Sequence, residues 1–540
     1  MSLASDERST DRRERDMLAS TAVLIICGSS YFSMLLGVLR SILVMRMLGP
    51  SSQGIRKVVD LFTKYLSNSH LGVLHGVNKQ VPILLGKAQP EDVQQVEDVG
   101  ITWIVALAIL ASGLMAAWGL RNPTGHPVTG FAIAIGAGSL LISQTYTVYR
   151  TMARAWGNFA ALGVVAGVET VTTFICTLGG AWKWGLLGAM AGTLLASCIS
   201  LVVLGALAPI RIRVSFDWRE GLALARIGLP IAIYILADTL LRTVDSATIV
   251  KYYEAYRMGL YSMATQIAAY LYAIPESIGF VIWPKILQAY GKADGDAKAL
   301  RRQIVLPTLI CGIYMPVLAG MTFVALPPLV ALLLPKFQVA TSAAQVLSLA
   351  SVFLAIPMAT NSLLIAHNKE MWAVGTKLIG AAVSAAGCLW VIHHGGSLMA
   401  LAMAATAGYG VAAIVSVLLV LPQYEKSPRH VAELFFALFS PFVWSLFALR
   451  ISSRIGILVW SHFVIEPVFG MAPAMHTSPA LSWKFTAVRL VVFLLLMLPV
   501  LIYGDSKTHV MREMRNMTKS WRAKPECGSD EHDRDTDTIA

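Results

Sequence analysis

The chain has 540 residues, of which 56% are hydrophobic and 14% are charged, and its formal net charge is +12 at pH 7. Together with a mean hydropathy of +0.64, this composition excludes a soluble globular protein and indicates a chain that crosses a membrane many times. In such a chain the positive charge indicates membrane topology and attraction to anionic lipid headgroups, and it gives no reason to expect nucleic-acid binding.

Fourteen segments have the length and apolarity of a membrane-spanning helix, which takes about 20 residues. Backbone groups in lipid have no water to bond, so each spanning segment must be helical. Twelve segments are well defined: 18–39, 55–77, 101–120, 128–149, 158–182, 184–210, 227–250, 258–283, 304–334, 337–366, 371–392 and 397–422. Two weaker ones follow at 434–449 and 481–503. The predicted fold is an all-α polytopic membrane protein with about fourteen transmembrane helices.

A block of sequence recurs with a constant offset of 205 residues. Residues 43–55 align with 248–260, and residues 86–88 align with 291–293 at the same spacing. An even number of segments in each half predicts a parallel repeat, related by an axis along the membrane normal, with a substrate path between the halves. Because the matched identities are few, chance similarity between two apolar regions is the alternative.

The connections divide the predicted chain into six parts. These are a disordered cytoplasmic tail (1–17), a six-helix bundle (18–208), an amphipathic cytoplasmic linker (209–225), a second six-helix bundle (226–421), a two-helix segment (422–504) and a disordered cytoplasmic tail (505–540). Most Lys and Arg residues of the connections fall on the side of the N-terminus, which predicts that both termini are cytoplasmic. The first apolar run is longer than a typical signal-peptide core and lacks a small-residue cleavage site, so we expect it to be retained.

No cofactor is predicted. The sequence has no Gly-rich phosphate loop followed by Lys and Ser or Thr, which argues against direct ATP hydrolysis. Five of its six cysteines lie in apolar segments as small packing residues, and neither a metal-ligand spacing nor a disulfide framework is present.

Charged residues within the predicted segments are the candidates for a functional site. Each costs about 2.5–3.5 kcal/mol at mid-membrane on insertion scales, so each should face a partner or a water-filled cavity. Asp238, Arg242 and Asp245 share one helical face, where Arg242 can pair with either carboxylate. The set is either a neutralised cluster that holds helices together or a polar path on which proton or cation binding drives transport.

Other charges extend this set. Asp60 and Lys64 are one helical turn apart, and Arg40 matches Asp245 on the 205-residue offset. This match gives two hypotheses. Arg40 and Asp245 form a gate between the halves, or Arg40 is an interfacial anchor near the end of its helix. Glu276 follows Pro275, where a kink can open a polar pocket. The full set of substrate-path candidates is Arg40, Asp60, Lys64, Asp238, Arg242, Asp245, Glu276 and Lys377.

Several short motifs resemble a known family. Residues 45–54 read Met-Arg-Met-Leu-Gly-Pro-Ser-Ser-Gln-Gly and resemble the R-x-LG-P-x-x-x-G turn of polysaccharide exporters. These exporters, which include O-antigen flippases, are a branch of the multidrug/oligosaccharidyl-lipid/polysaccharide (MOP) superfamily. Residues 228–230, 242–245 and 258–264 follow the family's order, and the pattern continues to 296. The resemblance covers about 18–421 and is most specific over 226–300.

The resemblance implies a V-shaped pair of helix bundles in the bacterial inner membrane and a transporter instead of an enzyme. The implied function is a flippase that moves a polyprenyl-pyrophosphate-linked oligosaccharide, such as an O-antigen or exopolysaccharide unit, by alternating access. Arg40, Lys64, Arg242 and Lys377 would suit its pyrophosphate. The implied partners are this lipid-linked substrate, membrane lipids, a coupling proton or sodium ion, and glycan polymerase and chain-length proteins.

Two alternatives stay open at this point. A cation-coupled multidrug exporter of the same superfamily would use carboxylates such as Asp60, Asp245 and Glu276. A membrane glycan polymerase or ligase would carry catalytic groups on a large outer loop, but the longest predicted outer stretch, 451–483, has no acid–base constellation.

Overall fold

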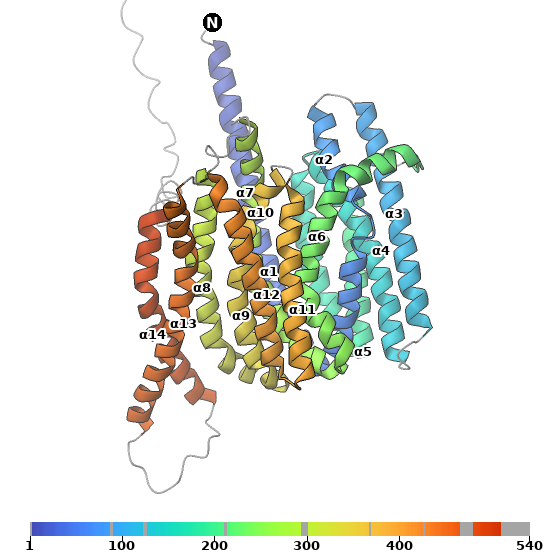
Figure 1. Cartoon of the computed structure of the whole chain (residues 1–540). Coiled ribbons are helices and arrows are strands. Elements are labelled where there is room, and N and C mark those ends of the chain that lie inside the picture. Colours follow the sequence, from blue (N-terminus) through green and yellow to red (C-terminus); the bar gives the residue numbers. More distant parts are fainter. Residues whose placement is uncertain are drawn as a thin grey trace, which may run out of the picture.

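The structure is a computed structural model that describes residues 3–86, 90–121, 127–209, 213–292, 301–366, 369–424, 427–464 and 479–508. All regular elements in these ranges are helical, which confirms the predicted all-α class (Figure 1). In chain order they are α1 (Leu3–Leu66), α2 (Val73–Gly86), α3 (Pro90–Leu120), α4 (Pro127–Ala155), α5 (Phe159–Leu207), α6 (Trp218–Tyr252), α7 (Ala255–Lys292), α8 (Arg301–Leu333), the 3-10 helix η1 (Pro335–Ala340), α9 (Thr341–Ala355), α10 (Pro357–Ala366), α11 (Glu370–His393), α12 (Leu398–Tyr424), α13 (Pro428–Val464) and α14 (Pro479–Thr508).

Within the described ranges, 11 helices have the length and composition to cross a membrane. Two of these helices contain two segments each, because α1 has non-helical backbone at Gly49 and α5 has it at Trp184 and Gly185. Both glycines have positive φ angles, 72° and 61°, which glycine adopts without a steric penalty. The break in α5 falls between two predicted segments. The all-helical membrane class is therefore confirmed, whereas the count of fourteen spans is not.

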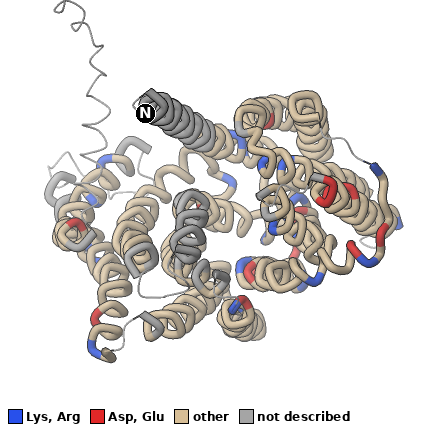
Figure 2. Tube along the Cα trace, turned by 90° about the horizontal axis from the view of Figure 1, so that it is seen from above, with Lys and Arg blue, Asp and Glu red and all other residues tan. Residues whose placement is uncertain are grey.

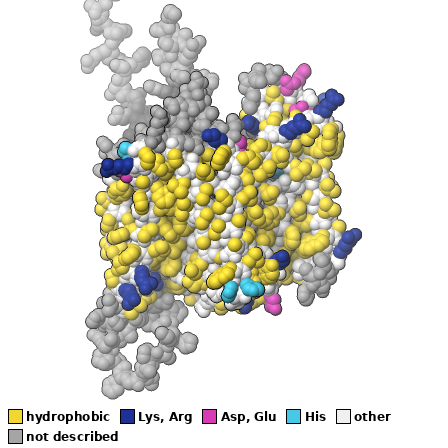
Figure 3. All heavy atoms as spheres, viewed as in Figure 1, with side chains coloured by type: hydrophobic (Ala, Val, Ile, Leu, Met, Phe, Trp, Pro, Cys, Tyr) yellow, Lys and Arg dark blue, Asp and Glu magenta, His cyan; other side chains and the backbone are white. Residues whose placement is uncertain are grey.

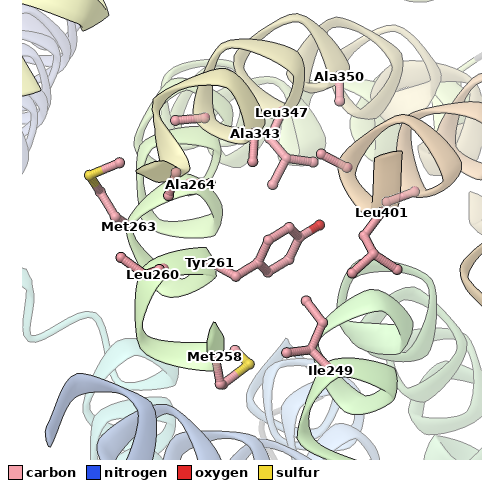
Figure 4. Close-up of a cluster of buried hydrophobic side chains, with 14 of the residues drawn as sticks. Ile249, Met258, Leu260, Tyr261, Met263, Ala264, Ala343, Leu347, Ala350 and Leu401 are labelled. Carbon is pink, nitrogen blue, oxygen red and sulfur yellow. The ribbon is translucent and has the colours of Figure 1, made fainter. Parts of the chain in front are cut away.

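The chain forms two helix bundles and an outer pair. Helices α1 to α5 pack together through cores around Ile104, Leu140 and Val165, and α6 to α12 pack around a core that includes Tyr261. Figure 4 shows Tyr261 of α7 among Ile249, Ala343, Leu347 and Leu401, which come from α6, α9 and α12. Helices α13 and α14 pack on α8 at one edge of the molecule. Figure 3 shows a broad hydrophobic belt with charged side chains toward its two edges.

The predicted connections differ from the structure in two places. Helix α1 begins at Leu3, so the stretch expected to be a disordered tail continues the first helix. The second half of the predicted linker belongs to α6, whose N-terminus is capped by the Asp217 carboxylate through the amides of Arg219 and Glu220. The C-terminal tail beyond Thr508 lies outside the described residues.

The two bundles touch where the repeated blocks meet. A methyl group added at Gly54 of α1 would overlap the carbonyl of Ala255 in α7, and one added at Gly259 of α7 would overlap the carbonyl of Pro50 in α1. Gly54 and Gly259 are equivalent on the 205-residue offset, as are Pro50 and Ala255. This exchange of equivalent partners is the geometry of an isologous contact about a twofold axis. The contact agrees with a parallel duplication and disfavours chance similarity.

A second contact between the bundles joins α2 to the first part of α6. Here Gly228 lies against the backbone of Gly72, and Gly76 lies against the carbonyl of Leu224. Glycines at both contacts let the backbones approach more closely than any side chain would allow. The bundles therefore meet at two close backbone contacts, and side chains such as Met45 of α1 and Leu224 of α6 also pack into the core of the opposite bundle.

Candidate functional site

Three of the predicted charges form one buried cluster between α6 and α11. The Asp238 carboxylate lies 2.7 Å from Nε of Arg242 through Oδ2 and 2.8 Å from Nζ of Lys377 through Oδ1. Arg242 also stacks on the ring of Tyr272 from α7, with its guanidinium carbon 4.0 Å from the ring centroid. Two cations thus share one carboxylate, so the cluster keeps an excess positive charge.

Helix geometry explains this assembly. Asp238 and Arg242 are one turn apart on α6, so they lie on the same face. Lys377 comes from α11, which packs on α6; Gly380 of α11 leaves room for Gly408 and Ala412 of α12 and also for Leu241 of α6. Only 5% of the Lys377 side chain is exposed, compared with 25% of Arg242. Lys377 therefore depends on Asp238 for its charge balance, whereas Arg242 remains accessible.

The N-terminal bundle presents a second group of charges toward this cluster. A cavity of about 230 Å³, which we call the interbundle cavity, lies between α1 and α7. It is lined by Arg40, Ser41, Met45, Gln53, Arg56, Lys57 and Asp60 of α1 and by Ser262 and Gln266 of α7. Lys64 of α1 lies in the electrostatic field of Asp60 and Asp238 and also of Lys57 and Arg242. Figure 2 shows Lys and Arg positions within the outline of the molecule seen from above as well as at its rim.

Asp245 lies apart from the Asp238 cluster, although it is in the electrostatic field of Lys57. Its carboxylate accepts hydrogen bonds from the Tyr261 hydroxyl at 2.6 Å and from the Ser246 amide at 2.6 Å, and the residue is 1% exposed. It shares a face with Asp238 but lies two turns, about 10 Å, further along α6, where α7 covers that face. The structure places no ion pair between Asp245 and Arg40 among the described residues. Arg40 instead lines the interbundle cavity, and Asp245 stabilises the second bundle.

Tyr261→Phe is therefore expected to destabilise the protein more than it alters transport. The substitution leaves a buried carboxylate oxygen without its hydroxyl donor, which costs about 1–3 kcal/mol. Thermal unfolding of the purified protein followed by circular dichroism should show a lower midpoint. Tyr256→Phe, at a residue of α7 that is 46% exposed, is the matched control and should leave the midpoint unchanged. Equal midpoints for wild type and Tyr261→Phe would contradict the structural role of this pair.

The remaining predicted residue, Glu276, lies on α7 one turn after Tyr272. It is exposed and lies in the electrostatic field of Arg242. Sequence reasoning missed Arg56, Tyr272 and Gln266. These residues carry no local signal, because only the packing of α7 against α1 and α6 brings them to the charges. Among the described residues no group of three or more His, Cys, Asp or Glu side chains could hold a metal ion.

A family model described as "Polysaccharide biosynthesis protein" matches residues 43–341, which is more than half of the chain. A curated relative, the "Probable multidrug resistance protein NorM" of Agrobacterium fabrum (strain C58 / ATCC 33970), is 27% identical over 275 residues. That match covers 47% of this chain and only 57% of the relative.

Two solved structures share the fold. The lipid II flippase MurJ in an inward closed conformation aligns with a TM-score of 0.66 and 13% identity, and it covers 89% of this chain and 99% of that chain. An inward-facing multidrug resistance MATE family transporter of the MOP superfamily aligns with a TM-score of 0.60 and 14% identity. The alignment covers 74% of this chain and 95% of that chain. At these identities the likeness shows a shared arrangement of helices.

Proposed function

The chain belongs to the polysaccharide biosynthesis protein family, and from this premise we propose that it is a flippase for a polyprenyl-pyrophosphate-linked oligosaccharide. The glycan headgroup and its pyrophosphate pass between the two bundles, while the polyprenyl tail stays in the bilayer. We place the protein in the bacterial cytoplasmic membrane with both termini in the cytoplasm, because the Lys and Arg residues of the connections gather on that side.

The charge balance of the interbundle cavity and the neighbouring Asp238 cluster carries this proposal. Six basic residues belong to these two groups: Arg40, Arg56, Lys57, Lys64, Arg242 and Lys377. Five carboxylates lie near them: Asp60, Glu169, Asp238, Asp245 and Glu276. Six cations against five carboxylates leave an excess of one positive charge. A pyrophosphate is attracted by this field, and Arg offers it two parallel donors.

The same balance disfavours a cationic drug. Of the carboxylates that a drug exporter would use, Asp245 is buried beneath Tyr261, and Asp60 lies beside Arg40, Arg56 and Lys57. At about 4 Å and an effective dielectric constant near 20, one unpaired charge changes the energy of a bound ion by roughly 4 kcal/mol. The similarity to a probable multidrug resistance protein keeps cation-coupled drug export as the second candidate.

The helices of the outer pair offer a place for the lipid tail. A groove of about 710 Å³ opens between α8, α13 and α14 and is lined mainly by apolar side chains such as Leu309, Ile313 and Phe436. A polyprenyl chain is hydrocarbon, so such a groove can hold its first part while the headgroup enters the protein. The lipid II flippase structure aligns over a larger share of this chain than the drug transporter does, which also favours a lipid-linked substrate.

Deletion of the gene tests the proposal in cells. We expect lipid-linked oligosaccharide to accumulate and surface polysaccharide to fall at least tenfold, because the translocation step is missing. Lipid extraction and surface glycan are measured in parallel, and a plasmid copy of the wild-type gene is the control. Normal lipid pools and normal surface glycan, combined with a loss of drug resistance, would favour the drug exporter.

A further inference from the structure

A second cavity lies within the first bundle and meets the interbundle cavity at Arg40. This cavity, which we call the α1–α5 cavity, has a volume of about 410 Å³. It lies between α1 and the two halves of α5 and is lined by Ser33, Leu36, Gly37, Arg40, Ala166, Glu169, Thr170, Thr173, Phe174, Thr193 and Ser197. Arg40 lines both cavities, so one guanidinium can contact groups in each.

Hydroxyl groups dominate the polar wall of the α1–α5 cavity. Thr170 donates to the carbonyl of Ala166 at 2.7 Å, Thr193 to Ala189 at 3.0 Å and Ser197 to Thr193 at 3.1 Å. Thr170 also pairs with the Ser33 hydroxyl at 2.5 Å, and Thr193 with the Thr177 hydroxyl at 3.1 Å, so part of their acceptor capacity is used within the protein. A hydroxyl oxygen carries two lone pairs, so these side chains still offer fixed acceptors for hydroxyl donors.

The two charged residues complete the set of hydrogen-bonding groups. One oxygen of Glu169 accepts from the Tyr146 hydroxyl at 2.8 Å, which leaves the other oxygen as an acceptor. Arg40 supplies only donors. Leu36 and Phe174 add apolar surface to the wall. The wall therefore combines one guanidinium donor, several hydroxyl and carboxylate acceptors and one aromatic ring, so that a few placed polar groups stand among apolar surface.

We propose that the α1–α5 cavity binds a sugar ring of the glycan headgroup while Arg40 also contacts the pyrophosphate in the interbundle cavity. A sugar ring carries hydroxyls that both donate and accept, and its C–H face packs on an aromatic ring. This assignment rests on the proposed flippase function and adds to it the site that recognises the glycan. The cavity would thus distinguish the glycosylated lipid from the bare lipid pyrophosphate.

Gly37 provides a direct way to fill the cavity. It lines the α1–α5 cavity, and a Cβ built on it meets no atom within 4 Å. Gly37→Leu therefore places a large apolar side chain in the cavity without a backbone clash. Gly179→Leu is the matched control, because Gly179 lies on α5, is exposed, does not line the cavity and has the same open space at its Cβ.

The experiment compares the binding of two lipids to the purified full-length protein in nanodiscs. One is undecaprenyl pyrophosphate, and the other is the polyprenyl-pyrophosphate oligosaccharide extracted from the deletion strain. We expect wild type and Gly179→Leu to bind the glycosylated lipid about tenfold more tightly, a difference of about 1.4 kcal/mol. Gly37→Leu should bind both lipids with the affinity of the bare one. If Gly37→Leu does not fold, Thr173→Val combined with Ser197→Ala should reduce the difference at least threefold.

The two proposals fail in different ways. Equal binding of both lipids by wild type would overturn the sugar site and leave the flippase proposal standing. A tenfold preference that persists in Gly37→Leu, or in the double variant where that one does not fold, would also overturn the assignment of this cavity. Binding of neither lipid would overturn the flippase proposal and the sugar site together.

Discussion

Arg242→Glu is expected to reduce surface polysaccharide at least hundredfold, to the level of a deletion strain. The substitution replaces a cation by a carboxylate beside Asp238, so Lys377 then faces two acids. The local charge falls by two units at the place where we expect the pyrophosphate. One unit of charge at about 4 Å is worth roughly 4 kcal/mol at an effective dielectric constant near 20, which is more than a hundredfold in binding. Surface glycan measured in the deletion strain carrying the variant gene checks the result.

The control for this substitution is another arginine on the outside of the molecule. Arg450 of α13 is exposed and does not line the groove between α8, α13 and α14. Arg450→Glu also changes the charge by two units, but it does so on the outer helix pair. It should leave export unchanged, and immunoblots of membranes should show both variants at wild-type levels. Wild-type export by Arg242→Glu would remove this residue from the substrate path.

Gly259→Ala is expected to reduce export at least tenfold while the protein remains in the membrane. The added methyl group overlaps the carbonyl of Pro50, so α1 and α7 must separate at the twofold contact between the bundles. Neither partner is the flexible end of a side chain, and the backbones cannot both keep their positions. Any transport state in which α1 and α7 make this contact is therefore destabilised. A transport cycle that passes through that state becomes slower. Export relative to protein level measures the effect.

A second glycine serves as the control that separates the steric overlap from a change in helix propensity. Gly205 of α5 has no atom within 4 Å of a built Cβ, so Gly205→Ala changes helix propensity without a clash. It should export at the wild-type rate. Gly54→Ala should behave like Gly259→Ala, because the two positions are equivalent in the repeat and each meets the other bundle. Normal export by both Gly54→Ala and Gly259→Ala would show that the contact does not close during transport.

Much of the fold could be predicted because spanning a membrane leaves few choices for the chain. Long apolar runs must be helices, and the 205-residue offset indicated which residues are equivalent in the two halves. The offset could not indicate how the halves meet. It paired Arg40 with Asp245, but the structure pairs equivalent glycines with the partner bundle's backbone and buries Asp245 beneath Tyr261.

At the candidate site, only the contact between residues of one helix could be predicted from the sequence. The one-turn spacing of Asp238 and Arg242 identified an ion pair, because neighbouring turns of one helix always share a face. The second partner of Asp238, Lys377, lies on α11, and nothing in the sequence specifies that α11 packs against α6. The stacking of Arg242 on Tyr272 and the α1–α5 cavity depend on the packing of distant helices in the same way.

Translocation by the purified protein tests the flippase proposal most directly. The protein is reconstituted into vesicles that contain the lipid-linked oligosaccharide extracted from the deletion strain, and a membrane-impermeant reagent that modifies the glycan is added outside. We expect wild-type vesicles to expose nearly all of the glycolipid to the reagent, and protein-free or Arg242→Glu vesicles to expose about half. Equal protection of the inner half in all three preparations would contradict the assignment of this chain as a lipid-linked oligosaccharide flippase.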